Sequence, residues 1–221
     1  MNAPMTRIAE CAEVLPGYAL KVRAEHEPEG IFQIVMAKHL TSYTTNRNVA
    51  DMIEKSAPPQ RAMSCLPYQY AESHELRITP KSNVHKYRIQ AGDVLFISRG
   101  VRNCAALVQS VPDQTIASGT LYILRPKANI EGGYLAWCLN QAPVQAQISK
   151  VRTGAGTPIV QRKVFTEITI PVPSIEEQRR LVELGALMTR EYQLRQQLLE
   201  ETGRLHRVLG QQLLQRMTSA N

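Results

Sequence analysis

The sequence predicts an α+β protein, with a mixed sheet in a domain over residues 1–173 and one long C-terminal coiled-coil helix over residues 174–221. Short β-branched runs bounded by Gly, Pro and Asn predict the sheet, and one helical pattern follows them. No proline occurs after Pro173, and the tail is rich in Glu, Gln, Arg and Leu. A chain of 221 residues can bury the core of one ordinary domain and carry an appendage.

The strands of the expected sheet are short apolar runs that end at turn-forming residues. The predicted strands are Ile31–Ala37, Asp93–Ser98, Ala105–Val111, Leu121–Leu124 and Ile168–Ile170. Between the last two, Gly132–Val151 has helical spacing, with a break expected near Pro143. The glycines and the proline of Arg152–Pro158 predict a loop after that helix.

The long helix has a clear start signal. Pro171 and Pro173 exclude helix before them, and Ser174-Ile-Glu-Glu177 forms a capping box. In this motif the Ser174 hydroxyl accepts from the Glu177 amide and the Glu177 side chain reaches back. We therefore predict one helix from Ser174 to Met217.

An apolar stripe follows this helix at steps of three, four or seven residues, with one slip near Glu191. Its members are Leu181, Leu184, Met188, Leu194, Leu198, Leu205, Leu209 and Leu213. About 40 helical residues span roughly 60 Å, which exceeds the diameter of a domain of this size. The stripe thus favours a partner helix, and the alternative is an amphipathic helix packed on its own domain.

The chain carries a net charge of +7, and the excess lies before the helix. From Ser174 onward seven Arg face six Glu, which leaves 19 basic against 13 acidic residues, or +6, in the preceding part. Residues 77–103 hold six Lys or Arg against Asp93 alone. Such a local excess favours a polyanionic partner.

Several function classes lack their motifs. The chain has no methyltransferase [DNS]-P-P-[YF] loop, no nuclease D/E-x-K after its Pro-Asp, no GxSxG elbow and no phosphate-binding Walker loop, so no catalytic residue is predicted. The cysteines, which we expect to be reduced and mostly buried, form no CxxC pair, and the histidines form no HExxH pair, so no metal site is predicted. Neither a membrane span nor a secretory signal can be identified, which predicts a cytoplasmic protein.

Two stretches carry a family resemblance. The first is Gly92-Asp-Val-Leu-Phe-Ile-Ser-Arg-Gly100, followed by Leu121-Tyr-Ile-Leu-Arg-Pro126 and Tyr134-Leu-Ala-Trp137; the second is Ile168-Thr-Ile-Pro-Val-Pro-Ser-Ile-Glu-Glu-Gln178. With the Gly-Thr loop near Thr157, they resemble the target-recognition domain and spacer helix of type I restriction-modification specificity subunits. Members of that family usually hold two such domains and two helices, whereas each signature occurs once here, so the chain resembles a half-subunit.

The resemblance implies a non-catalytic subunit that reads half of a bipartite DNA site in a phage-defence system. Its implied partners are double-stranded DNA, a modification subunit that binds S-adenosylmethionine, a restriction subunit where the system cuts DNA, and a second copy of the chain paired through the helix. No cofactor is expected in this chain.

Candidate DNA contacts are Lys and Arg for phosphates and Arg or Asn for bases, placed in loops at one edge of the sheet. We select Lys38, Lys81, Lys86, Arg99, Arg102, Asn103 and Arg152, with Arg162 and Lys163 as second choices. Each is also compatible with a solvated surface charge, and Arg99 beside Gly100 also suits a role in bracing its turn.

Two other functions are compatible with the sequence. One is a coiled-coil scaffold whose basic domain binds a protein partner, which predicts no DNA sequence preference and no steep salt dependence. The other is a standalone modifying or nicking enzyme, which requires activity from the purified chain.

Overall fold

A computed structural model describes residues 3–20, 26–40, 67–72, 75–80 and 83–218. The chain divides into two compact units, Met1–Arg179 and Arg180–Asn221. The first unit includes the first turn of the long helix, as far as Arg179. No helix in the described residues combines the length and apolar character that a membrane crossing requires.

The first unit contains a mixed five-stranded sheet in the order β2-β9-β6-β7-β4. Its strands are β2 (Ala12–Pro16), β4 (Tyr68–Gln69), β6 (Val94–Ile97), β7 (Ala105–Ser110) and β9 (Leu121–Pro126). All neighbours are antiparallel except β4 and β7, which are parallel. The three predicted strands in this sheet are confirmed within one or two residues at their ends.

A second sheet has the order β5-β3-β8, with β3 and β8 parallel. Its strands are β3 (Phe32–Val35), β5 (Arg77–Ile78) and β8 (Thr115–Ala117). The predicted strand at Ile31–Ala37 is confirmed in its centre, but the chain turns into the short helix α2 (Ala37–Leu40) after it. The 3-10 helix η2 (His85–Tyr87) lies on the chain between β5 and β6.

The central strand β6 is buried along its whole length because both of its faces are covered. Leu95 and Ile97 belong to a core cluster with Val35 of β3 and Ala117 of β8. On the opposite face, Phe96 stacks on Phe165 with ring centroids 4.3 Å apart. The main core therefore lies on both sides of the five-stranded sheet.

Helices follow the sheet in two short pieces, α4 (Gly132–Leu139) and α5 (Ala142–Lys150). The predicted break is confirmed, since Pro143 stands in the first turn of α5, where its missing N–H costs nothing. Helix α4 packs on β6 and β7, and the Asn140 side chain exchanges two hydrogen bonds with the backbone of Ala105 at 2.9 and 2.8 Å.

The predicted loop at Arg152–Pro158 is wrong in part. A small hairpin joins β10 (Arg152–Thr153) to β11 (Ile159–Val160), and Gly154, at φ 106°, occupies the left-handed conformation inside it. The glycines form the turn of a hairpin rather than excluding strands. Helix α6 (Arg162–Phe165) follows directly.

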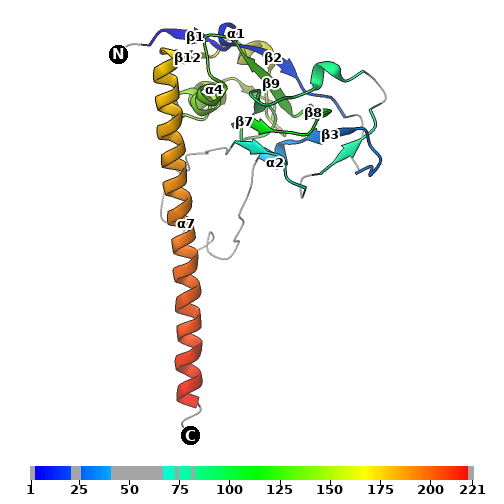
Figure 1. Ribbon diagram of the computed structural model, residues 1–221. Coiled ribbons are helices and arrows are strands. Elements are labelled where there is room, and N and C mark those ends of the chain that lie inside the picture. The colour runs from blue at the N-terminus through cyan, green and yellow to red at the C-terminus, as the bar shows by residue number, and fades with distance from the viewer. Residues whose placement is uncertain (1–2, 21–25, 41–66, 73–74, 81–82, 219–221) are drawn as a thin grey trace. The chain divides into compact units, whose positions relative to one another are not determined.

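The ends of the first unit are paired. Strand β1 (Met5–Arg7), which precedes helix α1 (Ile8–Cys11), is antiparallel to β12 (Thr169–Pro171), the strand before the long helix (Figure 1). The predicted strand at Ile168–Ile170 is confirmed with a shift of one residue.

Helix α7 spans Ile175–Thr218, which confirms the single long helix. The Ser174 hydroxyl accepts from the Glu177 amide at 3.3 Å, so this half of the predicted capping box is present. In its first turn Gln178 is fully buried and makes three hydrogen bonds, with the Glu131 amide and with the carbonyls of Asn129 and Pro173. These bonds tie the start of α7 to the loop before α4.

The cysteine prediction holds only in part. Cys11 and Cys138 are free and buried, as expected, but Cys104 is disulfide-bonded. Cys65 lies outside the described residues. Sequence spacing did not show this bond, because disulfide formation depends on spatial proximity rather than on paired motifs.

Candidate nucleic-acid interface

The loop of residues 99–103 between β6 and β7, here called the Arg99 loop, is anchored to the β10–β11 hairpin. The Gly100 amide donates to the Pro158 carbonyl at 2.7 Å, and Arg99 forms an isolated antiparallel β-bridge with Ile159. Gly100 has φ 96°, a conformation that glycine adopts without strain. The Arg99 loop and the hairpin turn therefore lie side by side, although more than fifty residues separate them in sequence.

Three side chains also hold the Arg99 loop in place through hydrogen bonds to backbone carbonyls. The Arg152 guanidinium donates to the Val101 carbonyl at 2.9 Å, and the Asn103 amide donates to the Ile97 carbonyl at 3.0 Å. Gln145 of α5 donates to the Asn103 carbonyl at 2.8 Å. The loop is thus preorganised, and it leaves Arg99, Val101 and Arg102 exposed.

These contacts change the interpretation of two predicted DNA contacts. Asn103 is only 2 % exposed, and its side chain bonds to a carbonyl within its own turn, which does not suit a base contact. Arg152 is half-buried and braces the Arg99 loop through Val101 and Ser149. Both side chains position the loop, because buried polar groups must satisfy their hydrogen bonds inside the protein.

The buried side chain of Tyr122 contacts the β10–β11 hairpin. Burial raises the pKa of the Tyr122 hydroxyl, and the charges of Arg162 and Arg99 act to lower it. The hydroxyl donates at 2.7 Å to the carbonyl of Val160, which precedes Arg162 by two residues. Because Arg99 pairs with Ile159 and Arg162 comes two residues after Val160, both arginines lie on the surface next to β11.

Beyond Arg162 this surface continues into an open groove, here called the basic groove. It is bordered by α1, β2, the end of β9 and α6. The cationic side chains that line it are Arg125, Lys127, Arg162 and Lys163. The structure thus brings the two second-choice residues, Arg162 and Lys163, together with two cations that sequence reasoning missed. Their signal was the pattern Arg125-Pro-Lys127, which ends a strand with two cations.

The remaining predicted contacts lie elsewhere. Lys38 is exposed on α2, past the end of its predicted strand, and Lys86 is exposed on η2, where its ammonium lies 5.0 Å from the centre of the Tyr87 ring. Lys81 falls outside the described residues. Within the described part of the chain, no group of three or more His, Cys, Asp or Glu side chains is placed to hold a metal ion.

Comparisons with known proteins identify the family of the chain. The family model described as "Type I restriction modification DNA specificity domain" matches residues 29–201. A search of curated protein sequences finds no match.

Two solved structures share the fold. The S subunit of the type I restriction-modification system from M. genitalium aligns with a TM-score of 0.52 at 11 % identity, over 86 % of this chain and 40 % of that one. A chain from a structural study of complex assembly and conformational transition of the type I R-M system aligns with a TM-score of 0.61 at 18 % identity, over 93 % of this chain and 43 % of that one. The chain therefore spans less than half the length of these proteins.

Proposed function

Because the chain belongs to the family of type I restriction modification DNA specificity domains, we propose that it reads one half of a bipartite DNA site for a DNA methyltransferase complex. In this role the chain itself catalyses nothing. The observation that carries the proposal is the Arg99 loop, whose exposed arginines stand on a backbone held by hydrogen bonds from Gly100, Asn103 and Arg152. Preorganised arginines suit bidentate contacts with guanine in the major groove.

The proposed partners are double-stranded DNA and a modification subunit that binds S-adenosylmethionine. A restriction subunit joins where the system also cuts DNA. The scaffold alternative is less favoured, since the family match concerns DNA specificity.

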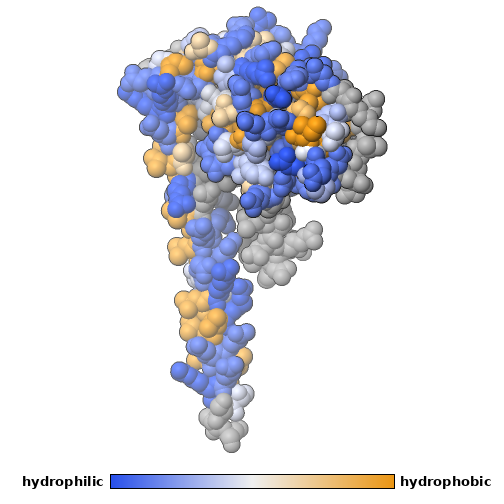
Figure 2. All heavy atoms as spheres, turned by 45° about the vertical axis from the view of Figure 1, so that its right-hand side comes forward, coloured by the Kyte–Doolittle hydropathy of each residue, from blue (hydrophilic) through white to orange (hydrophobic). Residues whose placement is uncertain are grey.

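We further propose that two copies pair through α7. The predicted stripe from Leu184 to Leu213 is exposed along the helix in the single chain, and Figure 2 shows apolar patches on its surface. A continuous apolar stripe of this length favours burial against a second helix. Two antiparallel copies would present two recognition domains with twofold symmetry, so the expected target is an interrupted palindrome. Pairing with a different half-subunit would instead produce an asymmetric target.

The first test replaces the exposed arginines of the loop. Arg99→Ala and Arg102→Ala are each expected to weaken binding to the preferred duplex by about 1–3 kcal/mol if the side chain reads a base. Sequence preference should relax with affinity, because a base contact discriminates between sequences. Fluorescence anisotropy with the preferred duplex and with an unrelated duplex measures both quantities.

Arg207→Ala is the matched control for this test, since it removes one exposed charge from α7 instead of from the loop. It is expected to leave the preference unchanged. Equal affinity and preference in both loop variants would place the reading surface elsewhere.

The second test concerns catalysis. The purified chain with S-adenosylmethionine is expected to transfer no methyl group to DNA, and addition of the cognate modification subunit should restore transfer. Tritium incorporation into duplex DNA measures it. Methyl transfer by the chain alone, after removal of trace partner protein, would refute the assignment as a non-catalytic subunit.

A further inference from the structure

The charges of the basic groove are not cancelled by their neighbours. Four cations line it against one carboxylate, that of Glu13. Asp93 offsets Arg125 partly, with 3.8 Å between the Arg125 Nε and a carboxylate oxygen. Counting both acids, four positive and two negative groups leave a local charge of +2.

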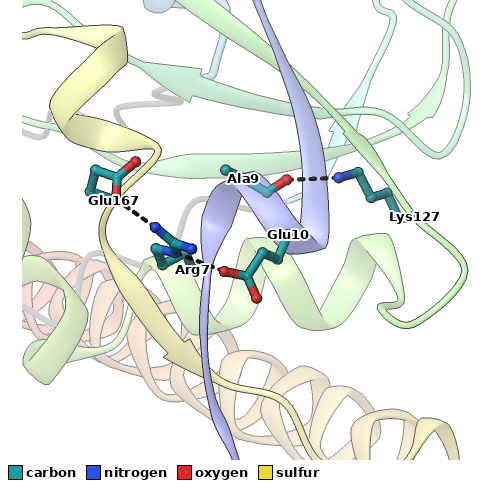
Figure 3. Close-up of polar contacts among 5 residues, drawn as sticks. All are labelled: Arg7, Ala9, Glu10, Lys127 and Glu167. Atoms are coloured by element: carbon teal, nitrogen blue, oxygen red, sulfur yellow. Dashed lines mark hydrogen bonds and ion pairs between the residues drawn. The ribbon is translucent and has the colours of Figure 1, made fainter.

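Two further carboxylates near the groove are already paired. Arg7 lies between Glu10 and Glu167, at 2.7 and 3.2 Å from their oxygens (Figure 3). These pairs raise the pKa of Arg7, chiefly through its hydrogen bond with Glu10. The Arg7 guanidinium therefore reduces the repulsion that these acids would exert on an anion in the groove.

Three of the groove cations are held in place by neutral carbonyl groups. Lys127 donates to Ala9 at 2.7 Å (Figure 3), Arg162 donates to Val14 at 3.2 Å, and Arg125 donates to Arg88 at 3.1 Å. A carbonyl orients a cation without neutralising it, so these hydrogen bonds leave the positive charges uncompensated, and among the described residues only Arg125 is partly offset, by Asp93. Such an arrangement is preorganised for an anion.

We propose that the basic groove binds phosphates of the DNA backbone next to the half-site, an inference that rests on the proposed recognition of DNA. Continuity favours this ligand, because Arg162 lines the groove and follows β11, the strand with which Arg99 pairs at Ile159. A strand whose bases meet the Arg99 loop would carry its phosphates along this surface. Phosphate contacts position the protein on the duplex and carry no sequence information.

The test uses Lys127→Gln and Lys163→Gln in the full-length chain. Each substitution removes one charge, and glutamine at position 127 keeps a donor for the Ala9 carbonyl. The probes are a duplex selected from a random library by the wild-type chain and an unrelated duplex of equal length. Affinities are measured by anisotropy over a salt series.

Each variant is expected to weaken binding of both duplexes by the same factor. For each copy of the chain bound to the duplex, the log–log salt slope should flatten by about 0.9 in a single variant and by about 1.8 in the double variant. Arg207→Ala is the control and should leave the slope unchanged. Unchanged slopes in both groove variants would overturn the inference. Weakening confined to the selected duplex would also overturn it, because that result indicates base reading.

The outcomes separate this inference from the proposed function. If the wild-type chain binds DNA but selects no sequence, the proposed function fails. The salt slopes measured with the unrelated duplex still show whether the basic groove binds phosphates. If the variants bind both duplexes normally but assemble poorly with the modification subunit, the groove serves a protein partner and the inference is wrong.

Discussion

A chain that ends at Glu183 is expected to be monomeric at micromolar concentration, whereas the full-length chain is expected to form a dimer. This truncation removes most of the apolar stripe of α7 but keeps Gln178 and its three hydrogen bonds, so the recognition domain retains its contacts with the start of the helix. The affinity for a duplex with both half-sites should fall by about 10²–10⁴-fold, because two linked modules bind with avidity. The affinity for a single half-site should not change. Light scattering and anisotropy measure the two effects.

A full-length variant with two substitutions tests the same prediction in case the truncated chain is unstable. Leu198→Glu with Leu205→Glu changes two stripe residues that are exposed in the single chain, so the monomer should tolerate them. The same loss of dimer and of avidity is expected. A monomeric wild-type chain, or a truncation as dimeric as the full-length chain, would show that α7 does not join two copies.

The second large effect concerns Gln178 and the stability of the recognition domain. Gln178→Leu keeps the volume of the side chain but leaves the Glu131 amide and the carbonyls of Asn129 and Pro173 without this partner. An unsatisfied buried polar group costs about 1–3 kcal/mol, so the free energy of unfolding should fall by at least about 2–3 kcal/mol. Denaturant unfolding followed by circular dichroism measures this loss.

The neighbouring residue supplies the control. Arg179→Gln removes an exposed ion pair with Glu131, which is worth at most about 1 kcal/mol in water. If Gln178→Leu is no more destabilising than Arg179→Gln, the hydrogen bonds of Gln178 do not secure the start of α7.

The local sequence pattern was sufficient to predict the central core strand and the long helix. The β-branched run in Val94–Ile97 and the capping box at Ser174 have direct physical causes within a few residues of chain, so sequence alone predicts them. The apolar stripe of α7 is likewise a property of spacing along one helix. The family resemblance rested on these same stretches, and the match over residues 29–201 agrees with it.

The very short strands could not be predicted in this way. Strand β10 holds two residues, and it exists because β11 pairs with it across a glycine turn. Two residues offer too little periodicity for a pattern, so the partner decides the structure. Helix α2, with four residues, is also too short for its periodicity to be recognised. Lys38 therefore lies on a helix where the sequence predicted the end of a strand.

The sequence by itself determined the α+β class, the long helix and the presence of many cations before it. Only the tertiary structure decided the role of each cation: Arg152 braces a loop, whereas Arg162, Arg125 and Lys127 meet in one groove. The reason is that a side chain's partners lie across the fold, as between Arg162 and the Val14 carbonyl, 148 residues apart. Burial and hydrogen bonding at such distances depend on how the chain packs, and residue type and spacing do not reveal them.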